Sequence, residues 1–251
     1  MELSEILSLA QEYEHQLPPA PAPLSFPEGT EIAGWIDHTL LKPEATAAQV
    51  RLLCEEAIQY HFASVCINPA YVPLACGLLR NAKENVCTVV GFPLGALLPE
   101  LKVYETLACI NYGASEIDMV INIGAIKSEA YGLVLNEVQT ITTLAHNQGA
   151  LVKVILETAL LTQREKIIAC LISQAAGADF VKTSTGFGTG GATIEDVELM
   201  RRVVGPEMGV KASGGIRTYA DAVAMIKAGA NRLGASAGVK IIQEAKATKN
   251  E

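Results

Sequence analysis

The sequence predicts a (β/α)8 barrel with an N-terminal helical extension. Short apolar or β-branched runs recur along the chain, and helical stretches separate them. Eight such runs follow residue 32 in a chain of 251 residues, and this strand–helix alternation indicates a parallel sheet. Eight units in this length match the closed TIM-barrel architecture. An open, doubly wound sheet is the alternative interpretation of the same alternation.

The first 31 residues are predicted to form an extension outside the barrel. Residues 3–15 place Leu3, Ile6 and Leu7 on one side of a helix. The segment LPPAPAPLSFPEG (17–29) then ends the helix with five prolines. We therefore expect an N-terminal helix and proline-rich strap over residues 1–31, and the barrel over residues 32–251.

Eight strands are expected in chain order. The candidates are WIDHTLL (35–41), FASVCIN (62–68), VCTVVGF (86–92), EIDMVIN (116–122), LVKVILE (151–157), DFVKTS (179–184), GVKASGG (209–215) and NRLGAS (231–236). Helix candidates between them include AAQVRLLCEEAIQY (47–60), TQREKIIACLISQAAG (162–177) and YADAVAMIKAGA (219–230). Gly177 and Gly229 follow such helices and are typical of C-terminal caps. These caps lie at the bottom of a barrel, so functional residues are expected at the other ends of the strands.

The composition excludes several classes of function. A hydrophobic fraction of 50% predicts a large folded core. The net charge of −8 and the pI near 5.1 argue against nucleic-acid binding, and no apolar run is long enough to span a membrane. Six dispersed cysteines and an acidic first stretch without a signal-peptide pattern predict a reduced, cytoplasmic protein. Cys/His clusters with ligand spacing are absent, so no metal is expected.

Charged residues inside apolar strands are the strongest functional signal. Asp118, Lys182 and Lys211 lie in the fourth, sixth and seventh candidates, and Lys153 and Asp37 are weaker cases. A buried charge is costly unless it is paired or functional, and a single Asp–Lys pair is compatible with a core ion pair. Two lysines with one aspartate favour a reactive lysine, because burial and a neighbouring cation both favour the nucleophilic free amine. Lysines in helical stretches are expected to face solvent: Lys102, Lys127, Lys166, Lys227 and Lys240.

Glycine-rich segments follow the last three strand candidates. GFGTGG (186–191) matches the GxGxxG pattern, but it lies in the sixth unit, whereas the dinucleotide fingerprint opens the first. Ser213-Gly214-Gly215 and Gly234-Ala235-Ser236 follow strands seven and eight, where barrels of this kind often bind phosphate. Tight turns that merely need glycine are the alternative interpretation of these segments.

Eight stretches in order carry a resemblance to a known family. They are DHTLLKP (37–43), VCINP (65–69), VVGFPLG (89–95), EIDMVINIGA (116–125), KVILET (153–158), VKTSTGFGTGGAT (181–193), VKASGGIRT (210–218) and LGAS (233–236). Over about residues 32–240 the chain resembles the deoxyribose-phosphate aldolases. The resemblance implies a class I aldolase that needs neither metal nor other cofactor. Such enzymes reversibly cleave 2-deoxy-D-ribose 5-phosphate to D-glyceraldehyde 3-phosphate and acetaldehyde, in deoxynucleoside catabolism.

The resemblance also implies a role for each residue of the matching motifs. Lys182 would form a Schiff base with the substrate, Lys211 would tune its reactivity, and Asp118 would move protons through water. The other implied residues contact the phosphate (Gly186, Gly214, Gly215 and Ser236) or line the pocket (Asp37, Thr39 and Cys66).

Two departures from the family and two rival functions stay open, and the first departure is the N-terminal extension, which lies outside the matched region. Some family members end in a tyrosine that assists proton transfer, whereas here the last tyrosine is Tyr219 and the tail KIIQEAKATKNE has none. A barrel whose lysine binds pyridoxal phosphate is one rival, and a non-catalytic phosphosugar-binding barrel is the other. The expected partner is a small phosphorylated sugar rather than nucleic acid or membrane. A homo-oligomer, a dimer or a tetramer, is compatible with the sequence, which does not decide between them.

Overall fold

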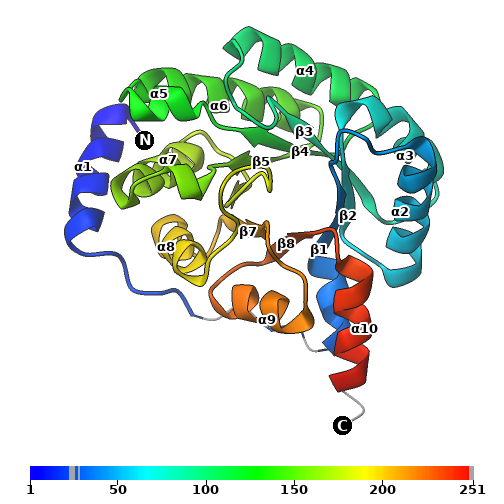
Figure 1. Cartoon of the computed structure of the whole chain (residues 1–251). Helices are drawn as coiled ribbons and strands as arrows, with labels where there is room; N and C mark the ends of the chain where they lie inside the picture. The colour runs from blue at the N-terminus through cyan, green and yellow to red at the C-terminus, as the bar shows by residue number, and fades with distance from the viewer. Residues whose placement is uncertain (23–25, 28, 249–251) are drawn as a thin grey trace.

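Eight parallel strands form a closed barrel in the computed structural model, which describes residues 1–22, 26–27 and 29–248. The strands follow the order of the sequence, and β8 pairs back onto β1 (Figure 1). They are β1 (Ile36–Leu40), β2 (Ser64–Ile67), β3 (Asn85–Val90), β4 (Glu116–Val120), β5 (Leu151–Ile155), β6 (Phe180–Lys182), β7 (Gly209–Ser213) and β8 (Arg232–Ala235). Closure confirms the predicted (β/α)8 barrel and excludes the doubly wound open sheet.

Helices form a ring outside the barrel (Figure 1). They are α1 (Leu3–His15), α2 (Ala47–Tyr60), α3 (Val72–Leu78), α4 (Pro99–Asn111), α5 (Ile123–Lys127), α6 (Tyr131–Asn147), α7 (Gln163–Ala175), α8 (Ile194–Val204), α9 (Tyr219–Lys227) and α10 (Gly238–Thr248). Short 3-10 turns are η1 (Gly29–Trp35), η2 (Pro69–Tyr71) and η3 (Thr158–Leu160). None of these helices, within the described ranges, is both long and apolar enough to cross a membrane.

Local signals set where the helices begin and end. Thr162 and Thr218 are the N-caps of α7 and α9, and each hydroxyl accepts a hydrogen bond from the backbone N–H three residues later. Beyond the ends of the same helices, Gly177 and Gly229 adopt φ angles of 79° and 114°, which confirms the predicted caps. These turns lie just before β6 and β8, so the opposite ends of the strands are left for function.

The alternation of side chains along a strand explains how charges come to lie inside the barrel. Ile117 and Met119 of β4 belong to the large apolar core between strands and helices. Asp118, between them, points the opposite way, as successive side chains of a strand must. Lys153 takes the equivalent place between Val152 and Val154 of β5. The barrel interior therefore receives the charged residues of strands that otherwise contribute apolar side chains.

The N-terminal extension lies along the outer ring of helices. Helix α1 packs against α7, and its Ile6 and Ala10 are fully buried in the main apolar core. Arg202 of α8 holds the strap, because its guanidinium donates to the backbone carbonyls of Leu17 and Pro18 at 3.0 Å and 2.7 Å. The division of the chain after residue 31 stays a prediction.

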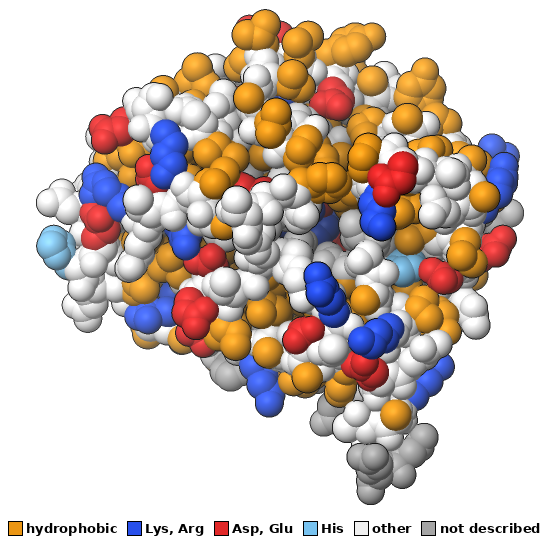
Figure 2. Space-filling model, in the orientation of Figure 1, with side chains coloured by type: hydrophobic (Ala, Val, Ile, Leu, Met, Phe, Trp, Pro, Cys, Tyr) orange, Lys and Arg blue, Asp and Glu red, His pale blue; other side chains and the backbone are white. Residues whose placement is uncertain are grey.

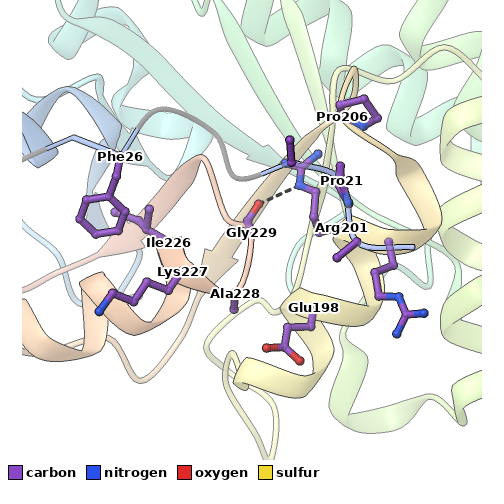
Figure 3. Close-up of a pocket in the computed structure, with 12 residues that line it drawn as sticks. Pro21, Phe26, Glu198, Arg201, Pro206, Ile226, Lys227, Ala228 and Gly229 are labelled. Carbon is purple, nitrogen blue, oxygen red and sulfur yellow. Dashed lines mark hydrogen bonds between the residues drawn. The ribbon is translucent and has the colours of Figure 1, made fainter. Parts of the chain in front are cut away.

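A pocket of about 490 Å³ lies beneath the strap. Pro21 and Phe26 of the strap face Arg201 of α8 and the chain around Gly229 (Figure 3). The Arg201 guanidinium is already engaged by backbone carbonyls, including that of Gly229 at 2.8 Å. None of the predicted site residues is among the described residues that line this pocket, so it lies apart from the predicted chemistry.

Candidate active site

The three charged side chains predicted from the sequence meet inside the barrel. Asp118 lies in the middle of β4, Lys182 ends β6, and Lys211 is the third residue of β7. Lys182 and Lys211 are partners in the register of these adjacent strands. All three residues are at most 2% exposed, so the energy of each charge depends on its protein neighbours rather than on water.

Asp118 is shared between lysines from three strands. Its Oδ2 accepts hydrogen bonds from Lys182 Nζ at 2.7 Å and Lys211 Nζ at 2.6 Å. Its Oδ1 accepts from Lys153 Nζ at 2.9 Å and from the Cys87 thiol at 3.1 Å. Lys153, a weaker candidate in the sequence, therefore belongs to the same group of residues as the three stronger ones.

Further charges extend this group toward the N-terminal end of the barrel. Lys153 Nζ lies 2.5 Å from Glu116, and Lys211 Nζ lies 2.5 Å from Asp37. Arg232 joins these two carboxylates, at 2.6 Å from Asp37 and 2.7 Å from Glu116. We call these residues the charge cluster: Lys153, Lys182, Lys211, Arg232, Asp37, Glu116 and Asp118. With every member ionised, it carries one positive charge in excess.

Ion pairing decides the protonation of two members of the charge cluster. Burial alone would raise the pKa of Asp118, but Lys153, Lys182 and Lys211 outweigh burial and hold this pKa well below its ordinary value. Burial alone would lower the pKa of Lys211, but Asp118 and Asp37 outweigh it and raise this pKa. Asp118 is thus a carboxylate at neutral pH, and Lys211 is the predicted cation beside Lys182.

A pocket of about 380 Å³ opens above the charge cluster. The face that holds it is hollowed near the middle of the barrel (Figure 2). Its lining includes Lys182 and five other predicted site residues: Thr39, Gly186, Gly214, Gly215 and Ser236. Asp37, Asp118 and Lys211 are not part of the lining, because they are buried in the charge cluster beneath it. Lys182 alone of the charge cluster reaches both the buried carboxylate and the pocket.

Close backbone packing explains the glycines around the pocket. A Cβ on Gly191 would lie 2.5 Å from the carbonyl oxygen of Gly214, so the close approach of the loops after β6 and β7 requires glycine at position 191. Gly186 and Gly215 adopt φ angles of 82° and 84°, which other residues rarely adopt. The tight-turn interpretation therefore holds for these positions, and it is compatible with an anion site, because the same turns line the pocket.

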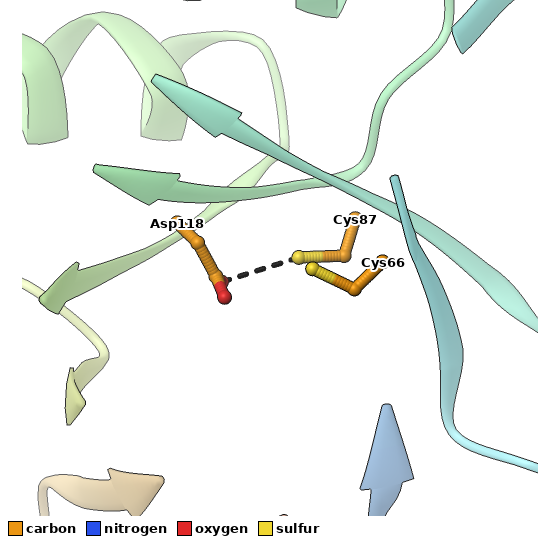
Figure 4. A group of neighbouring side chains, drawn as sticks. All are labelled: Cys66, Cys87 and Asp118. Atoms are coloured by element: carbon orange, nitrogen blue, oxygen red, sulfur yellow. Dashed lines mark hydrogen bonds between the residues drawn. The ribbon is translucent and has the colours of Figure 1, made fainter. Parts of the chain in front are cut away.

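Cys66 does not line the pocket as implied by the resemblance. It is fully buried and packs with Leu41, Cys87 and Val89. Figure 4 shows the two thiols side by side next to Asp118. Their sulfurs and a carboxylate oxygen lie within 4.8 Å of one another, but this set suits a metal poorly, since Asp118 already pairs with three ammonium groups. Burial also raises the pKa of Cys87 well above its ordinary value, so it remains a thiol.

Sequence reasoning missed several residues of the site. Glu116 and Arg232 stand at the starts of their strands, where a charge is equally typical of a solvated strand end. Lys42 and Arg217 line the pocket and lie within the motifs DHTLLKP (37–43) and VKASGGIRT (210–218), which could have identified them. The prediction that Lys102 faces solvent is wrong: it is fully buried, because Glu137 of α6 pairs with its ammonium group.

Comparison with known proteins agrees with this geometry. A family model described as DeoC/LacD family aldolase matches residues 32–244. The deoxyribose-phosphate aldolase of Thermococcus gammatolerans is 58% identical over 220 residues, which cover 87% of this chain and 98% of the relative. That of Halalkalibacterium halodurans is 60% identical over 212 residues, covering 84% of this chain and 94% of the relative.

A solved structure shows the same fold over the whole chain. The tetrameric deoxyribose phosphate aldolase of Aeropyrum pernix superposes with a TM-score of 0.83 at 36% sequence identity. The alignment covers 99% of this chain and 100% of that one. Family model, sequence relatives and structure agree: this chain belongs to the DeoC/LacD aldolase family.

Proposed function

We propose that this protein is a deoxyribose-phosphate aldolase. It reversibly cleaves 2-deoxy-D-ribose 5-phosphate to D-glyceraldehyde 3-phosphate and acetaldehyde through a Schiff base on Lys182. The observation that carries the proposal is the position of Lys182, which lines the pocket while its Nζ contacts the carboxylate of Asp118. The family and the relatives described above support the same reaction.

The charge cluster favours Lys182 as the nucleophile among its three lysines. Lys153 contacts three carboxylates, those of Asp37, Glu116 and Asp118, and Lys211 contacts two of them. Lys182 contacts Asp118 alone. Since the charge cluster has one positive charge in excess, the loss of a proton from Lys182 sacrifices the fewest ion pairs. The resulting free amine is the form that attacks a carbonyl.

The reaction balances without a redox partner or a metal. The amine of Lys182 adds to the aldehyde carbon C1 of the open-chain sugar, and loss of water gives an iminium ion. The electron pair of the C2–C3 bond then moves into the iminium as the hydroxyl on C3 loses its proton, which releases glyceraldehyde 3-phosphate. Protonation of the remaining enamine at C2 and addition of water release acetaldehyde and the free lysine. Asp118 moves these protons through a water molecule. Lys211 holds the Asp118 carboxylate in place through its hydrogen bond to Oδ2.

The phosphate is proposed to lie at the outer end of the pocket. Gly214 and Gly215 follow β7, and Ser236 lies two residues before α10, so backbone N–H groups are available there. Lys42 and Arg217 add positive charge to the same lining. An anionic substrate is thus attracted locally despite the net charge of −8.

We also propose that the chain assembles into a homo-oligomer and works in the cytoplasm. Large apolar side chains are exposed on the β3–α4 loop and α4, including Leu94, Leu98, Leu101 and Tyr104. We call these four residues the α4 face. Exposed apolar patches of this kind often mark protein interfaces. Six free cysteines, five of them buried, suit a reducing compartment.

The proposed activity is tested by incubating the purified protein with 2-deoxy-D-ribose 5-phosphate and measuring both products. We expect acetaldehyde and glyceraldehyde 3-phosphate in equal amounts, with a rate that EDTA leaves unchanged. Lys182→Arg should be nearly inactive, because a guanidinium stays protonated and cannot form the Schiff base. Absence of both products with the unmutated protein, or full activity of Lys182→Arg, would contradict the proposal.

A further inference from the structure

Lys102 is a buried lysine outside the charge cluster. It lies on the inner side of α4 and is fully buried, as are Lys153 and Lys211. Its Nζ donates to Glu137 of α6 at 2.9 Å and to the backbone carbonyl of Val120 at 2.9 Å. Burial lowers the pKa of Lys102 and raises the pKa of Glu137, in each case against the attraction of the partner. Buried ion pairs are poor sources of stability, so this pair calls for another explanation.

The contacts of Lys102 connect α4 to the ends of two strands. Val120 is the last residue of β4, two positions after Asp118. The aliphatic stem of Lys102 lies against Gly91, the first residue after β3, where a Cβ would come within 2.8 Å of Lys102 Cε. Glu105, one turn further along α4, accepts a hydrogen bond from the Gly91 N–H at 2.8 Å. Two side chains of α4 therefore fix the C-terminal ends of β3 and β4.

The loop that begins at Gly91 contacts a residue that lines the pocket. It carries Phe92, whose ring meets the ring of Phe187 edge to face, with centroids 5.3 Å apart. Phe187 lines the pocket. Further along the loop, Gly95 passes so close to the chain after β4 that a Cβ would lie 2.1 Å from the carbonyl oxygen of Ile121. A shift of the β3–α4 loop therefore also disturbs the end of β4.

We propose that Lys102 and Glu105 are positioning residues for the aldol reaction. They hold the ends of β3 and β4 so that Asp118 keeps its contact with Lys182 beneath the pocket and Phe92 keeps its contact with the lining residue Phe187. The inference rests on the proposed function, because aldol cleavage is its readout. A displacement of about 1 Å, even one caused far from the reacting atoms, can lower the rate about 10²-fold. The loss should fall on kcat rather than KM, since the proposed phosphate contacts belong to the segments after β1, β6, β7 and β8 and not to the β3–α4 loop.

Two substitutions at Glu105 form a matched test. Glu105→Gln keeps an oxygen that can accept the hydrogen bond from Gly91, whereas Glu105→Met keeps the size of the side chain and leaves only a weak thioether acceptor. We expect kcat of Glu105→Gln to stay close to that of the unmutated enzyme. Glu105→Met should lose about 10²-fold in kcat with KM little changed. Equal kcat values for the two variants would overturn the role of Glu105.

A double substitution separates positioning by Lys102 from mere stability. Lys102→Met alone would leave Glu137 buried without a partner, so it is combined with Glu137→Leu, since an apolar pair often restores stability. We expect a thermal midpoint near that of the unmutated protein but a reduced kcat. The control is Lys166→Met with Asp196→Leu, which removes an ion pair between α7 and α8 and should leave kcat unchanged.

The outcomes distinguish this inference from the proposed function. An unmutated protein without aldolase activity refutes the proposed function itself. An active unmutated protein together with a stable, fully active Lys102→Met/Glu137→Leu variant refutes only the positioning role of Lys102. Should the double variant fail to fold, the Glu105 pair still tests whether α4 positions the end of β3, because it alters one acceptor and leaves the buried ion pair in place.

Discussion

At the scale of single residues, Asp118 determines how the two predicted lysines interact. One oxygen, Oδ2, accepts from both Lys182 and Lys211. Lys211 therefore acts on Lys182 in two ways: its charge opposes a second positive charge nearby, and it takes part of the attraction of Asp118. These two effects are the basis of the proposed role of Lys211.

Lys211→Leu should move imine formation to higher pH. The substitution removes the positive charge next to Lys182 and leaves Oδ2 of Asp118 to Lys182. We measure how the yield of borohydride trapping with acetaldehyde depends on pH. We expect this dependence to shift to higher pH by about one pH unit or more, which is equivalent to about a tenfold loss of trapping at neutral pH. Lys211→Arg keeps the charge and should keep the profile. An unchanged profile in Lys211→Leu with collapsed turnover would make Lys211 a proton carrier or substrate contact instead.

At the scale of elements, the loops after β6 and β7 meet at the backbone carbonyl of Gly214. Ala192 N–H donates to the carbonyl of Gly214 at 3.0 Å, and Gly191 lies against the same carbonyl. This contact brings together two loops that line the pocket. The arrangement of the two loops that line the pocket thus depends on the absence of a side chain at Gly191.

Gly191→Ala should damage both stability and activity. Its Cβ would lie 2.5 Å from the Gly214 carbonyl oxygen, so the loops must separate, at a cost of about 1–3 kcal/mol in the free energy of unfolding. We expect kcat/KM to fall about tenfold or more for a shift of this size. Gly77→Ala is the matched control, because it lies within α3 with nothing within 4 Å and should stabilise by about 0.5–1 kcal/mol. A Gly191→Ala variant that behaves like Gly77→Ala would refute the close contact.

The elements also show what the sequence could and could not predict. The strands were recognisable as short apolar or β-branched runs, and Asp118 and Lys211 were recognisable as functional candidates because they are charged residues within such runs. The burial of Lys102 was not predictable, because it depends on Glu137, which lies 35 residues later on another helix. The contact between Arg232 and Glu116 spans 116 residues, and only closure of the barrel brings the two together.

At the scale of the whole molecule, the α4 face is expected to mediate self-association. Leu94, Leu98 and Tyr104 are 73%, 66% and 72% exposed, which is unusual for side chains of their size. Light scattering should give a molar mass that is a multiple of 26.6 kDa. Leu98→Asp with Leu101→Asp should lower that mass, because an interface core excludes charge. A monomer mass for the unmutated protein would refute the homo-oligomer, and an unchanged mass for the double variant would place the interface elsewhere.

Closure of the barrel assembles the candidate site, because the charge cluster and the pocket contain residues of strands from both ends of the sequence. Asp37 of β1 and Arg232 of β8 are 195 residues apart and form an ion pair 2.6 Å long. The sequence motifs predicted most of these residues one by one. Their division into a buried charge cluster and an open pocket, with Lys182 belonging to both, was visible only in the folded barrel.

The most direct test of the account is to identify the lysine that forms the Schiff base. The unmutated protein is incubated with acetaldehyde, the imine is reduced with borohydride, and the digested protein is mapped by mass spectrometry. The account predicts an ethyl group on Lys182 as the main modification, and none at position 182 in Lys182→Arg. Modification mainly on Lys211 or Lys153 would contradict it, because it would place the free amine on a lysine that the charge cluster holds with two or more carboxylates.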